Sequence, residues 1–451
     1  MSEWKKVKID FATIKLGDYI EPIKTTVADT GDKNPIVYGV SNKDGISQTG
    51  KPASKDISNY IVLEKDCFAF NPYRINVGSI GVNDENLKGC VSPAYVVFKT
   101  KNGLLPKFLY FYLKSDYGIH LINWYGNRGG VRNALRYSDL CKIDIPDIRH
   151  LNQEKLLKTF SSAWTQIEEL NKEIEKQKNY AKQLRQNILQ EAIEGKLTAD
   201  WRKQHPVQKG NPDYDAQALF DKIQAEKSET KSSKKTSVPI TKDEIPFEIP
   251  TGWKWVRLGE IMESVVYGTS AKCSYDEKQN SAILRIPNIS SGQIDISDLK
   301  YTNLSESEKK ELSLKENDIL VIRSNGSPEI VGKMVCVPKS CEKYCYAGYL
   351  IRLRFTNPQI GYFIAKMSNA RSQRNQIEDP IRSTVGINNI NTEEIKNLKY
   401  PLPPLAEQKE IVARVEKHLQ TITQLETQIA TRETTTKQLM QSILKDAFEE
   451  K

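Results

Sequence analysis

The sequence lacks the features that mark membrane and secreted proteins. Its longest apolar runs, such as Phe108–Leu113, are far shorter than the roughly 20 residues needed to span a bilayer. The N-terminal residues MSEWKK contain no apolar signal core, so we expect a cytoplasmic protein without a membrane partner. The seven cysteines are odd in number and irregularly spaced, and this pattern predicts no disulfide framework.

Catalytic signatures are equally scarce. The sequence has only four histidines, and it contains no GxxxxGKS or GxxxxGKT phosphate loop, no GxGxxG turn after a strand and no HExxH pair. Cys336, Cys341 and Cys345 cluster, but they form no CxxC pair and have no histidine nearby, which favours buried thiols over a zinc site. We therefore expect no catalytic residue, no metal and no cofactor in this chain.

One fragment, Asn71-Pro72-Tyr73, is similar to the Asn-Pro-Pro-aromatic loop with which amino-methyltransferases hold a flipped adenine. Tyr73 stands where that loop has its second proline, and no glycine-rich cofactor loop precedes it. The fragment therefore favours a turn at the end of a strand.

The composition is that of a chain that folds into several domains. With 38% hydrophobic and 27% charged residues, the chain has enough apolar side chains for buried cores. A length of 451 residues predicts about three domains. The formal net charge of +9 favours a polyanionic partner, although it also suits an ordinary globular protein.

An internal repeat organises the chain. A shift of 255 residues aligns 146–196 with 401–451 without a gap, and 14 of the 51 paired positions are identical. The strongest match pairs 182–192 (KQLRQNILQEA) with 437–447 (KQLMQSILKDA). Such self-similarity predicts two copies of one structural unit.

Each copy carries a heptad pattern typical of a coiled-coil helix of about 40 residues, or near 60 Å, and the two copies are the simplest partners for each other. We expect these side chains at their interface: Phe160, Ile167, Leu170, Ile174, Leu184, Ile188, Val415, Ile422, Leu425, Ile429, Leu439 and Ile443. If the helices run antiparallel about a pseudo-twofold axis, the polar seam residues Gln177 and Arg432 meet and fix the register. The alternative, equally open from the sequence, is that these two residues mark where the helices separate.

The segments before the helices are strand-rich. Short β-branched and aromatic runs, such as Tyr60–Leu63, Tyr95–Phe98 and Tyr349–Phe355, are separated by turn residues. One helix is expected in each segment, at Pro106–Ile122 and Gln359–Ile377.

The predicted fold class is therefore α+β, with two mixed domains joined by two long antiparallel coiled-coil helices in a pseudo-twofold repeat. The expected divisions are a first domain (1–145), a first long helix (146–197), a linker with a short helix (198–244), a second domain (245–400) and a second long helix (401–451). Within the linker, Glu226–Ile240 is rich in lysine, serine and threonine and predicts solvated chain.

Side chains suited to DNA gather in both domains. Arginine reads guanine bidentately, asparagine or glutamine reads adenine, and lysines, hydroxyls and backbone amides hold phosphates. The candidates in the first domain are Asn71, Tyr73, Arg74, Asn76, Tyr125, Asn127, Arg128, Arg132, Asn133 and Arg136. Those in the second are Arg285, Asn288, Arg323, Ser324, Asn325, Arg371, Arg374, Arg382, Ser383, Thr384, Asn388 and Asn389. A solvated loop is the simpler explanation for any single residue, whereas the paired clusters favour contact with DNA.

Together with the repeat, four segments resemble the DNA-specificity subunit of type I restriction–modification systems. They are 71–79 (NPYRINVGS), 195–201 (GKLTADW), 249–260 (IPTGWKWVRLGE) and 401–412 (PLPPLAEQKEIV). The resemblance covers essentially the whole chain. The first long helix departs from it, because 146–154 has PDIRHLNQE in place of a Pro-Leu-Pro-Pro-Leu signature.

The resemblance implies a non-catalytic subunit of an enzyme complex. Two target-recognition domains would each read half of a split site in double-stranded DNA, while the helices hold them apart and dock two methyltransferase subunits. Those subunits would use S-adenosylmethionine to methylate adenine, and two motor-endonuclease subunits would use ATP and Mg. Domains that face one side of B-DNA need half-sites about one helical turn, roughly 34 Å, apart, so the helices would act as a ruler.

Two alternatives stay open. A coiled-coil scaffold whose domains bind other proteins would show DNA affinity that is absent or insensitive to salt, since phosphate contacts make binding fall steeply with salt. A self-sufficient adenine methyltransferase would transfer methyl groups as a purified single chain, and we expect no such transfer.

Overall fold

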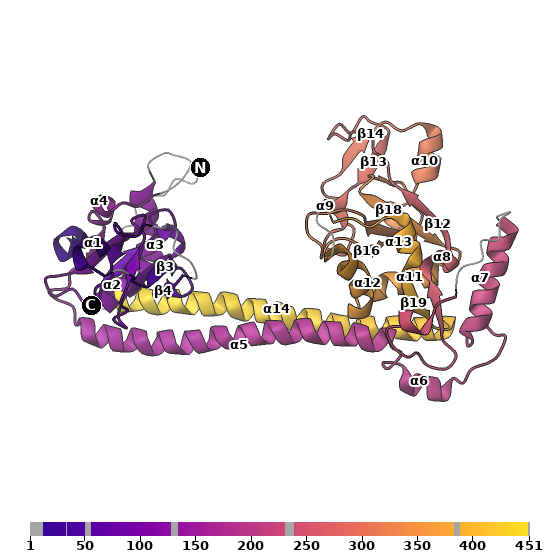
Figure 1. The fold of residues 1–451 in the computed structure, drawn as a ribbon, viewed down its shortest axis with the longest axis horizontal. Helices are drawn as coiled ribbons and strands as arrows, with labels where there is room; N and C mark the ends of the chain where they lie inside the picture. The colour runs from indigo at the N-terminus through magenta and orange to yellow at the C-terminus, as the bar shows by residue number, and fades with distance from the viewer. Residues whose placement is uncertain are drawn as a thin grey trace. The chain divides into compact units, whose positions relative to one another are not determined.

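The computed structural model describes residues 12–32, 34–49, 56–127, 134–230, 239–382 and 388–449. The chain divides into two compact units, Met1–Lys176 with Ile429–Lys451, and Gln177–Gln428. Each unit holds one strand-rich domain together with a segment of each long helix, α5 (Gln153–Ile193) and α14 (Leu405–Glu449) (Figure 1). Across the described ranges, none of the helices combines the length and the apolar character that a bilayer crossing needs.

The first domain is built from two four-stranded sheets with helices around them. One sheet has the order β2 (Ile20–Pro22), β9 (Val96–Thr100), β6 (Phe68–Phe70), β7 (Ile80–Val82), and its neighbours are all antiparallel. The other has the order β4 (Gly45–Gln48), β3 (Val37–Ser41), β8 (Cys90–Val91), β5 (Ile61–Val62), with β3 and β8 parallel. A separate pair joins β1 (Thr13–Lys15) to β10 (Asp144–Pro146). The helices are η1 (Leu16–Tyr19), α1 (Val27–Thr30), η2 (Ile75–Val77), α2 (Pro106–Lys114), α3 (Asp116–Gly126) and α4 (Tyr137–Leu140).

The second domain has a four-stranded and a three-stranded sheet. The first has the order β12 (Met262–Tyr267), β18 (Leu350–Phe355), β15 (Ile319–Ile322), β16 (Met334–Cys336), again antiparallel throughout. The second has the order β14 (Lys300–Thr302), β13 (Ser281–Leu284), β17 (Cys345–Tyr346), with β13 and β17 parallel. The remaining pair is β11 (Lys254–Arg257) with β19 (Lys399–Leu402). The helices are α8 (Leu258–Ile261), α9 (Ile286–Ile289), α10 (Glu306–Leu312), η4 (Lys339–Cys341), α11 (Pro358–Met367), α12 (Arg371–Arg382) and α13 (Thr392–Asn397).

These two domains have the same topology, so the repeat extends beyond the long helices. Strands β2-β9-β6-β7 correspond in order and direction to β12-β18-β15-β16, and β4-β3-β8 correspond to β14-β13-β17. In both domains the strand that enters pairs with the strand that leaves toward a long helix. The sequence identity found in the helices is therefore the visible part of a duplication of the whole unit.

Aromatic side chains fill the core of the first domain and fix α5 to it. Phe68 stacks on Phe98 with ring centres 4.7 Å apart, and both rings are fully buried. Phe111 of α2 contacts Phe160 of α5 at 5.6 Å, and Phe160 belongs to the same buried cluster. Burying such rings stabilises the contact by roughly 1.5–3 kcal/mol each, so the start of α5 is an integral part of this domain.

The single helix expected in each domain is in fact two. The stretch Pro106–Ile122 is divided into α2 and α3 at Ser115, whose Oγ accepts a hydrogen bond from the Gly118 N–H at 3.0 Å and caps α3. The stretch Gln359–Ile377 is likewise divided into α11 and α12, and Ser368 ends α11. Serine favours helix ends because its hydroxyl bonds the free backbone groups there, and the apolar periodicity alone did not reveal these ends.

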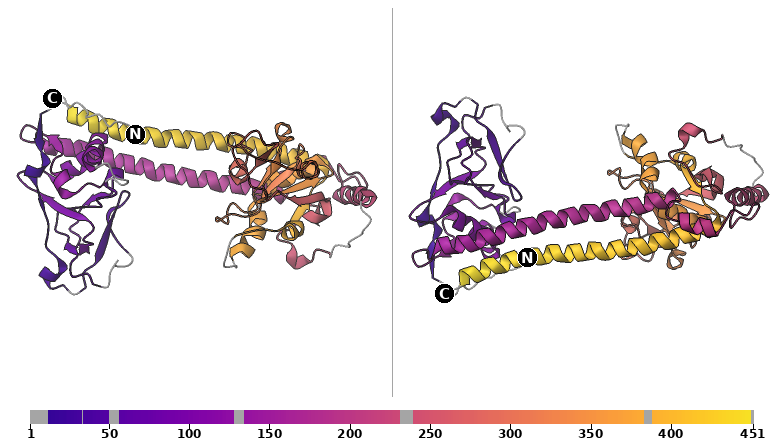
Figure 2. Two further views of the ribbon diagram at one scale, coloured as in Figure 1. Left: turned by 90° about the horizontal axis from the view of Figure 1, so that it is seen from above. Right: turned by 90° about the horizontal axis from the view of Figure 1, so that it is seen from below.

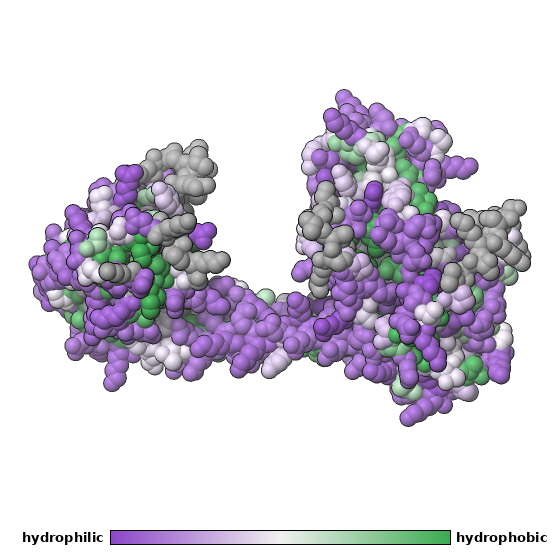
Figure 3. All heavy atoms as spheres, viewed as in Figure 1, coloured by the Kyte–Doolittle hydropathy of each residue, from purple (hydrophilic) through white to green (hydrophobic). Residues whose placement is uncertain are grey.

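The two long helices are confirmed, with 41 and 45 residues. Within the second unit their segments run in opposite directions, because Arg185 contacts Glu426 whereas Asp200, beyond the end of α5, contacts Arg414. Figure 2 shows these segments side by side in both views, and Figure 3 shows mostly hydrophilic residues along their visible face. This is the pattern of helices that turn one apolar row toward each other.

That buried row is only half of the predicted interface. At seven-residue spacing, the buried predicted residues are Ile167, Ile174 and Ile188 in α5, and Val415, Ile422 and Ile429 in α14. Phe160 is also buried, but against Phe111 of α2. The predictions for Leu170, Leu184, Leu425 and Leu439 are wrong, since these side chains are 42% to 46% exposed. The side chain of Ile443 lies outside the described part of the structure.

The second row of the interface lies one residue later than predicted, and it does so in both helices. Its half-buried members are Arg185 in α5 and Glu426 in α14, which pair at 2.9 Å, whereas the half-buried Trp164 packs against the Phe111 ring of α2. A residue four positions along a helix is turned by about 40° from the first, whereas a residue three positions along is turned by about 60° the other way. The helices therefore bury the nearer neighbours of the isoleucine row and leave the leucines on the outer side.

The predicted linker is more ordered than expected. It contains α6 (Ala199–Gln204), α7 (Ala216–Thr230) and η3 (Lys242–Glu244). Ala216, Leu219 and Ile223 are buried, and the Lys227 ammonium donates to the carbonyl oxygens of Gly259 and Glu260 at 2.9 Å. Residues 226–230, which were predicted to be part of a solvated linker, form the last residues of α7, and Ser228 there is exposed. The segment 231–238 lies outside the described residues.

Candidate nucleic-acid interface

In the first domain, two candidate segments that are distant in the sequence meet. Asn71 follows the central strand β6, and its Oδ1 accepts a hydrogen bond from the Tyr73 N–H at 3.0 Å, which holds a tight turn. Tyr73 and Arg74 are exposed at the tip of this turn. The Leu135 N–H donates to the Pro72 carbonyl at 3.0 Å. Backbone contact therefore sets the loop after β6 beside the segment that leads to α4.

The second domain brings together the equivalent segments. Arg323, Ser324 and Asn325 follow the central strand β15. The Ile390 N–H donates to the Arg323 carbonyl at 2.9 Å, and the Asn325 N–H donates to the Asn388 carbonyl at 3.2 Å. The Asn388 side chain also donates to the Gly326 carbonyl at 3.1 Å. Two of the clusters predicted from the sequence thus form one surface.

The repeat relates these two loop pairs. Leu135 and Ile390 are 255 residues apart, the shift that aligns the long helices, and each donates its N–H to the loop after the central strand. The equivalent positions are consequently Pro72 and Arg323, followed by Tyr73 and Ser324. The backbone arrangement is the same, whereas the side chains that it presents are different.

The other candidates of the first domain are spread around this surface. Asn127, at the end of α3, and Arg136, before α4, are exposed. Asn76 is half-buried in η2, and Tyr125 is half-buried against the domain core. Arg128, Arg132 and Asn133 lie outside the described residues.

Some candidates of the second domain have structural partners instead. Asn288 is 2% exposed, and its amide donates to the carbonyl oxygens of Asp295 and Asp298 at 2.9 Å. Arg374 pairs with Glu378 at 3.0 Å and donates to backbone carbonyls of the loop before β16. These two side chains hold local turns, so we withdraw them as DNA contacts; a sequence pattern cannot distinguish such a role from a solvent-facing one.

The remaining candidates of this domain have varied surroundings. Arg371 and Asn389 are exposed, and Ser324 and Asn389 form an isolated bridge between the two loops. Arg285 pairs with Asp298 at 2.9 Å. The side chain of Arg382, together with Ser383 and Thr384, lies outside the described residues.

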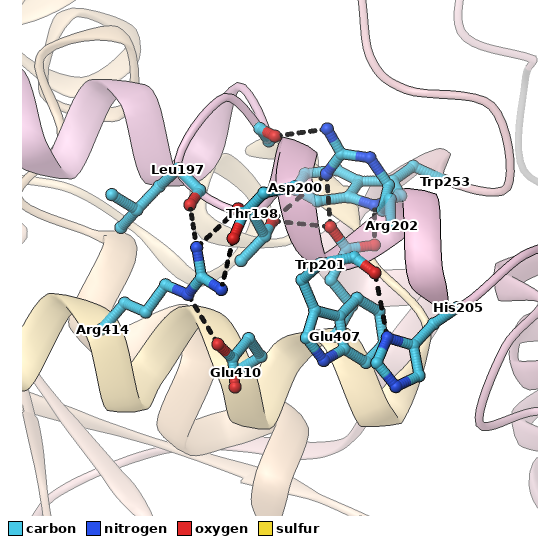
Figure 4. Close-up of polar contacts among 11 residues, drawn as sticks. Leu197, Thr198, Asp200, Trp201, Arg202, His205, Trp253, Glu407, Glu410 and Arg414 are labelled. Atoms are coloured by element: carbon cyan, nitrogen blue, oxygen red, sulfur yellow. Dashed lines mark hydrogen bonds and ion pairs between the residues drawn. The ribbon is translucent and has the colours of Figure 1, made fainter.

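A buried carboxylate organises a second site that the sequence-based list of candidates missed. Glu407, near the start of α14, is 2% exposed. Its carboxylate accepts hydrogen bonds from the Thr198 hydroxyl at 2.6 Å and the Trp253 indole at 2.7 Å, and it pairs with Arg202 (Figure 4). We call Thr198, Arg202, Trp253 and Glu407 the Glu407 cluster. Its charge-assisted bonds compensate the cost of burying the carboxylate.

Two helical turns farther along α14, a second arginine ties α14 to the segment after α5. Arg414 donates to the Leu197 carbonyl at 2.9 Å and to Asp200 at 2.6 Å and 3.0 Å, and it also pairs with Glu410 (Figure 4). The hydrogen bond from Arg414 is the main cause that lowers the pKa of Asp200 to about 2. The chain that leaves α5 is therefore fastened to the start of α14.

The Glu407 cluster explains three of the segments that carry the family resemblance. Thr198 belongs to GKLTADW, Trp253 to IPTGW and Glu407 to PLPPLAEQ. At the corresponding position of the first long helix, Asn152 only caps α5, accepting from the Lys155 N–H at 3.0 Å. The departure of PDIRHLNQE from the signature thus coincides with a different task for this residue.

The cysteines and acidic residues offer no obvious metal site. All seven cysteines are free thiols, and burial raises the pKa of Cys336 to about 11. In the part of the chain that the structure describes, no three histidine, cysteine, aspartate or glutamate side chains are grouped as metal ligands.

Comparisons with known proteins point the same way. Residues 250–432 match the family model described as "Type I restriction modification DNA specificity domain". The chain is 25% identical over 345 residues to the StySPI specificity subunit of Salmonella potsdam, covering 76% of this chain and 65% of that protein. It is 27% identical over 311 residues to the EcoKI specificity subunit of Escherichia coli, covering 69% and 57%. The matches thus span somewhat less than two thirds of these curated relatives.

A solved chain has the same fold. It comes from the structure described as "Structural basis underlying complex assembly and conformational transition of the type I R-M system", with a TM-score of 0.63, 16% identity, and coverage of 98% of this chain and 99% of that one. Fold and repeat define a protein of two related mixed domains joined by long helices. The family match over residues 250–432 and the curated relatives agree with the resemblance seen in the sequence: the chain is similar to the DNA-specificity subunits of type I restriction–modification systems.

Proposed function

We propose that this chain is the DNA-specificity subunit of a type I restriction–modification complex and reads a bipartite DNA site, one domain for each half. The observation that carries this proposal is the repeated loop pair. The same backbone contact joins the loop after the central strand to a second segment in both domains, yet the side chains differ. Two readers of one design with different side chains suit two unlike half-sites.

The long helices would set the distance between the half-sites. Opposite directions of α5 and α14 within the second unit, given by Arg185 with Glu426, support an antiparallel pair. An antiparallel pair about a pseudo-twofold axis would turn both domains toward one duplex. The division into domains at 1–145 and 245–400, with helices at 146–197 and 401–451 and a linker at 198–244, is part of this proposal.

The outer face of the helices is the proposed docking surface for two methyltransferase subunits. Leu170 and Leu184 in α5 correspond through the 255-residue shift to Leu425 and Leu439 in α14, and all four are exposed. Apolar side chains repeated at this spacing on a solvent face indicate packing against further helices. Two copies of the stripe suit two copies of one partner.

In this proposal the catalytic steps belong to other subunits. The methyltransferases would bring S-adenosylmethionine and methylate adenine, and two motor-endonuclease subunits would bring ATP and Mg. The chain itself would supply binding, orientation and spacing in the cytoplasm.

The test is DNA binding as a function of salt, measured on the chain in complex with its methyltransferase partner. We expect affinity that falls linearly on a log–log plot against salt and that depends on both halves of the site. Affinity that is absent or insensitive to salt would instead favour the protein-binding scaffold. Methyl transfer by the purified chain alone would favour the methyltransferase alternative.

A further inference from the structure

A cavity of about 560 Å³ opens in the second domain beside the loop that follows β15. Its walls are the end of β12 with the loop after it (267–271), the turn before β18 (347–349), and the side chains of Arg285, Lys300 and Arg323. Among the described residues that line it, three are basic and none is acidic. The volume is typical of pockets that hold a small ligand, about 300–1,000 Å³.

Two arginines in this wall have hydrogen-bonding capacity to spare. Within the described part of the chain, the Nε atoms of Arg285 and Arg323 are buried without a hydrogen-bond partner. Asp298 holds the other end of the Arg285 guanidinium at 2.9 Å, and the Arg323 guanidinium lies 4.8 Å from the centre of the Tyr267 ring. Together with Lys300, these two cations favour an anion in the cavity.

Aromatic rings stand beside these cations. Tyr349 is 65% exposed and Tyr267 is 37% exposed, and both line the cavity. An exposed tyrosine ring offers a flat surface on which a nucleic acid base can stack. A cationic wall next to such a ring suits a ligand with a negative charge and a flat apolar face, and a nucleotide has both.

We propose that this cavity binds one nucleotide of the DNA strand next to the half-site read by the second domain. Arg285 and Lys300 would hold its phosphate, and Tyr349 would stack on its base or sugar. This inference rests on the proposed function. Arg323 links the cavity to the reading loops. Its backbone N–H donates to the Tyr349 carbonyl at 2.8 Å, and its backbone carbonyl accepts from the Ile390 N–H.

The proposed nucleotide site distinguishes the second domain from the first. At the position of Arg323, the first domain has Pro72, which carries neither a charge nor an N–H. The cation that joins cavity and loop therefore belongs to the second domain alone. Loss of the nucleotide contact should weaken recognition of one half-site and leave the other unchanged.

The test uses the full chain in complex with its methyltransferase partner and a duplex that carries the recognised site. We expect Tyr349→Ala to weaken DNA binding about 5- to 150-fold, the range for loss of one stacked base. We expect Lys300→Gln to reduce the slope of log affinity against log salt by about 1. Lys278→Gln removes an exposed lysine of the same domain that does not line the cavity, and it should leave both quantities unchanged.

Thermal unfolding of each variant shows whether it folds, and the exposed position of Tyr349 predicts that its variant does. Unchanged affinity in Tyr349→Ala with an unchanged slope in Lys300→Gln overturns the inference but leaves the proposed function, provided that the unmodified complex binds DNA. Absence of DNA binding by the unmodified complex overturns both. A third arm uses deoxyadenosine monophosphate: variants that lose affinity for it but keep DNA binding would assign the cavity to a free nucleotide and contradict the inference.

Discussion

The two globular domains agree in backbone and differ in the side chains that their loops present. Both have a central strand followed by a loop whose carbonyl accepts an N–H from a segment 60 or more residues farther along. The first domain offers Tyr73 and Arg74 there, whereas the second offers Arg323, Ser324 and Asn325. A duplicated fold thus preserves the framework of the site while its chemistry changes, and this division allows one chain to carry two specificities.

The contacts between each domain and its long helix also use different side chains in the two domains. In the first domain, Lys114 of α2 lies 5.2 Å from the Tyr110 ring centre and 6.0 Å from that of Trp164, and burial lowers the pKa of Lys114. In the second, Lys366 of α11 pairs with Glu416 of α14 at 2.8 Å. Burial lowers the pKa of Lys366 too, but hydrogen bonds to Glu416 and Tyr362 outweigh it and raise the pKa.

The largest effect is expected from exchanging one domain, which tests whether the two domains read their half-sites independently. Replacing residues 1–145 with the corresponding domain of another specificity subunit should change one half of the methylated motif completely and leave the other half and the gap as they were. Each domain reads alone in this account, so the effects should not mix. Sequencing of methylated genomic DNA measures the outcome, and changes in both halves would contradict independent reading.

The spacing between the domains can be altered without touching either reader. Insertion of one heptad after residue 176 and another after residue 431, which are equivalent positions, should lengthen the gap by about three base pairs. Seven residues at 1.5 Å add about 10 Å, and base pairs are stacked about 3.4 Å apart. The methylated motif reports the gap, and an unchanged gap would exclude the helices as a ruler.

The Glu407 cluster sharpens the comparison between the starts of the two long helices. Glu407→Ala should lower the free energy of unfolding by about 3 kcal/mol, because it leaves the Trp253 indole without its acceptor and Arg202 without its counter-charge. Asn152→Ala, at the equivalent position of α5, removes only a helix cap and should cost about 1 kcal/mol. Urea unfolding measures both. Equal losses would mean that the cluster does not fasten the linker to α14.

The smallest expected effect concerns pH and has opposite signs in the two domains. Since the pKa of Lys366 is raised by its partners, its stabilisation is complete below about pH 10 and is lost as the pH rises through the raised pKa. The pKa of Lys114 is lowered by burial, so the folded state releases its proton first and stability rises as the pH approaches the ordinary lysine value of about 10.4.

Lys114→Met and Lys366→Met test this contrast against the unmodified chain. We compare the unfolding free energy of the unmodified chain with that of each variant at about pH 8 and about pH 10.5. As the pH rises, the unmodified chain should become more stable relative to Lys114→Met and less stable relative to Lys366→Met. Shifts of the same sign in both variants would contradict the assigned causes.

The sequence was sufficient for the elements that depend on local pattern. The strands at Val96–Thr100 and Leu350–Phe355, the two long helices and the repeat all follow from local sequence patterns. Features set by three-dimensional packing were missed. Ser115 ends a helix because its hydroxyl finds a backbone donor, which the apolar pattern does not encode.

The prediction of the interface between the long helices was partly wrong for the same kind of reason. Leu184 fits a heptad seam and Arg185 does not, yet Leu184 is 45% exposed and Arg185 pairs with Glu426 of α14. The sequence pattern does not show which of the two neighbours faces the other helix. Similarly, Asn288 has the chemistry of a base-reading side chain but is used by nearby carbonyl oxygens. The hydrogen bond between the backbones of Asn325 and Asn388 joins segments that are far apart in the sequence, and no local pattern predicts it.

The most direct measurement is the methylation pattern of genomic DNA in cells that carry this chain with its methyltransferase partner. We predict modified adenines within a motif of two specified parts separated by a gap of fixed length and free sequence. A single continuous motif, or methylation that is the same when the chain is deleted, would contradict the account.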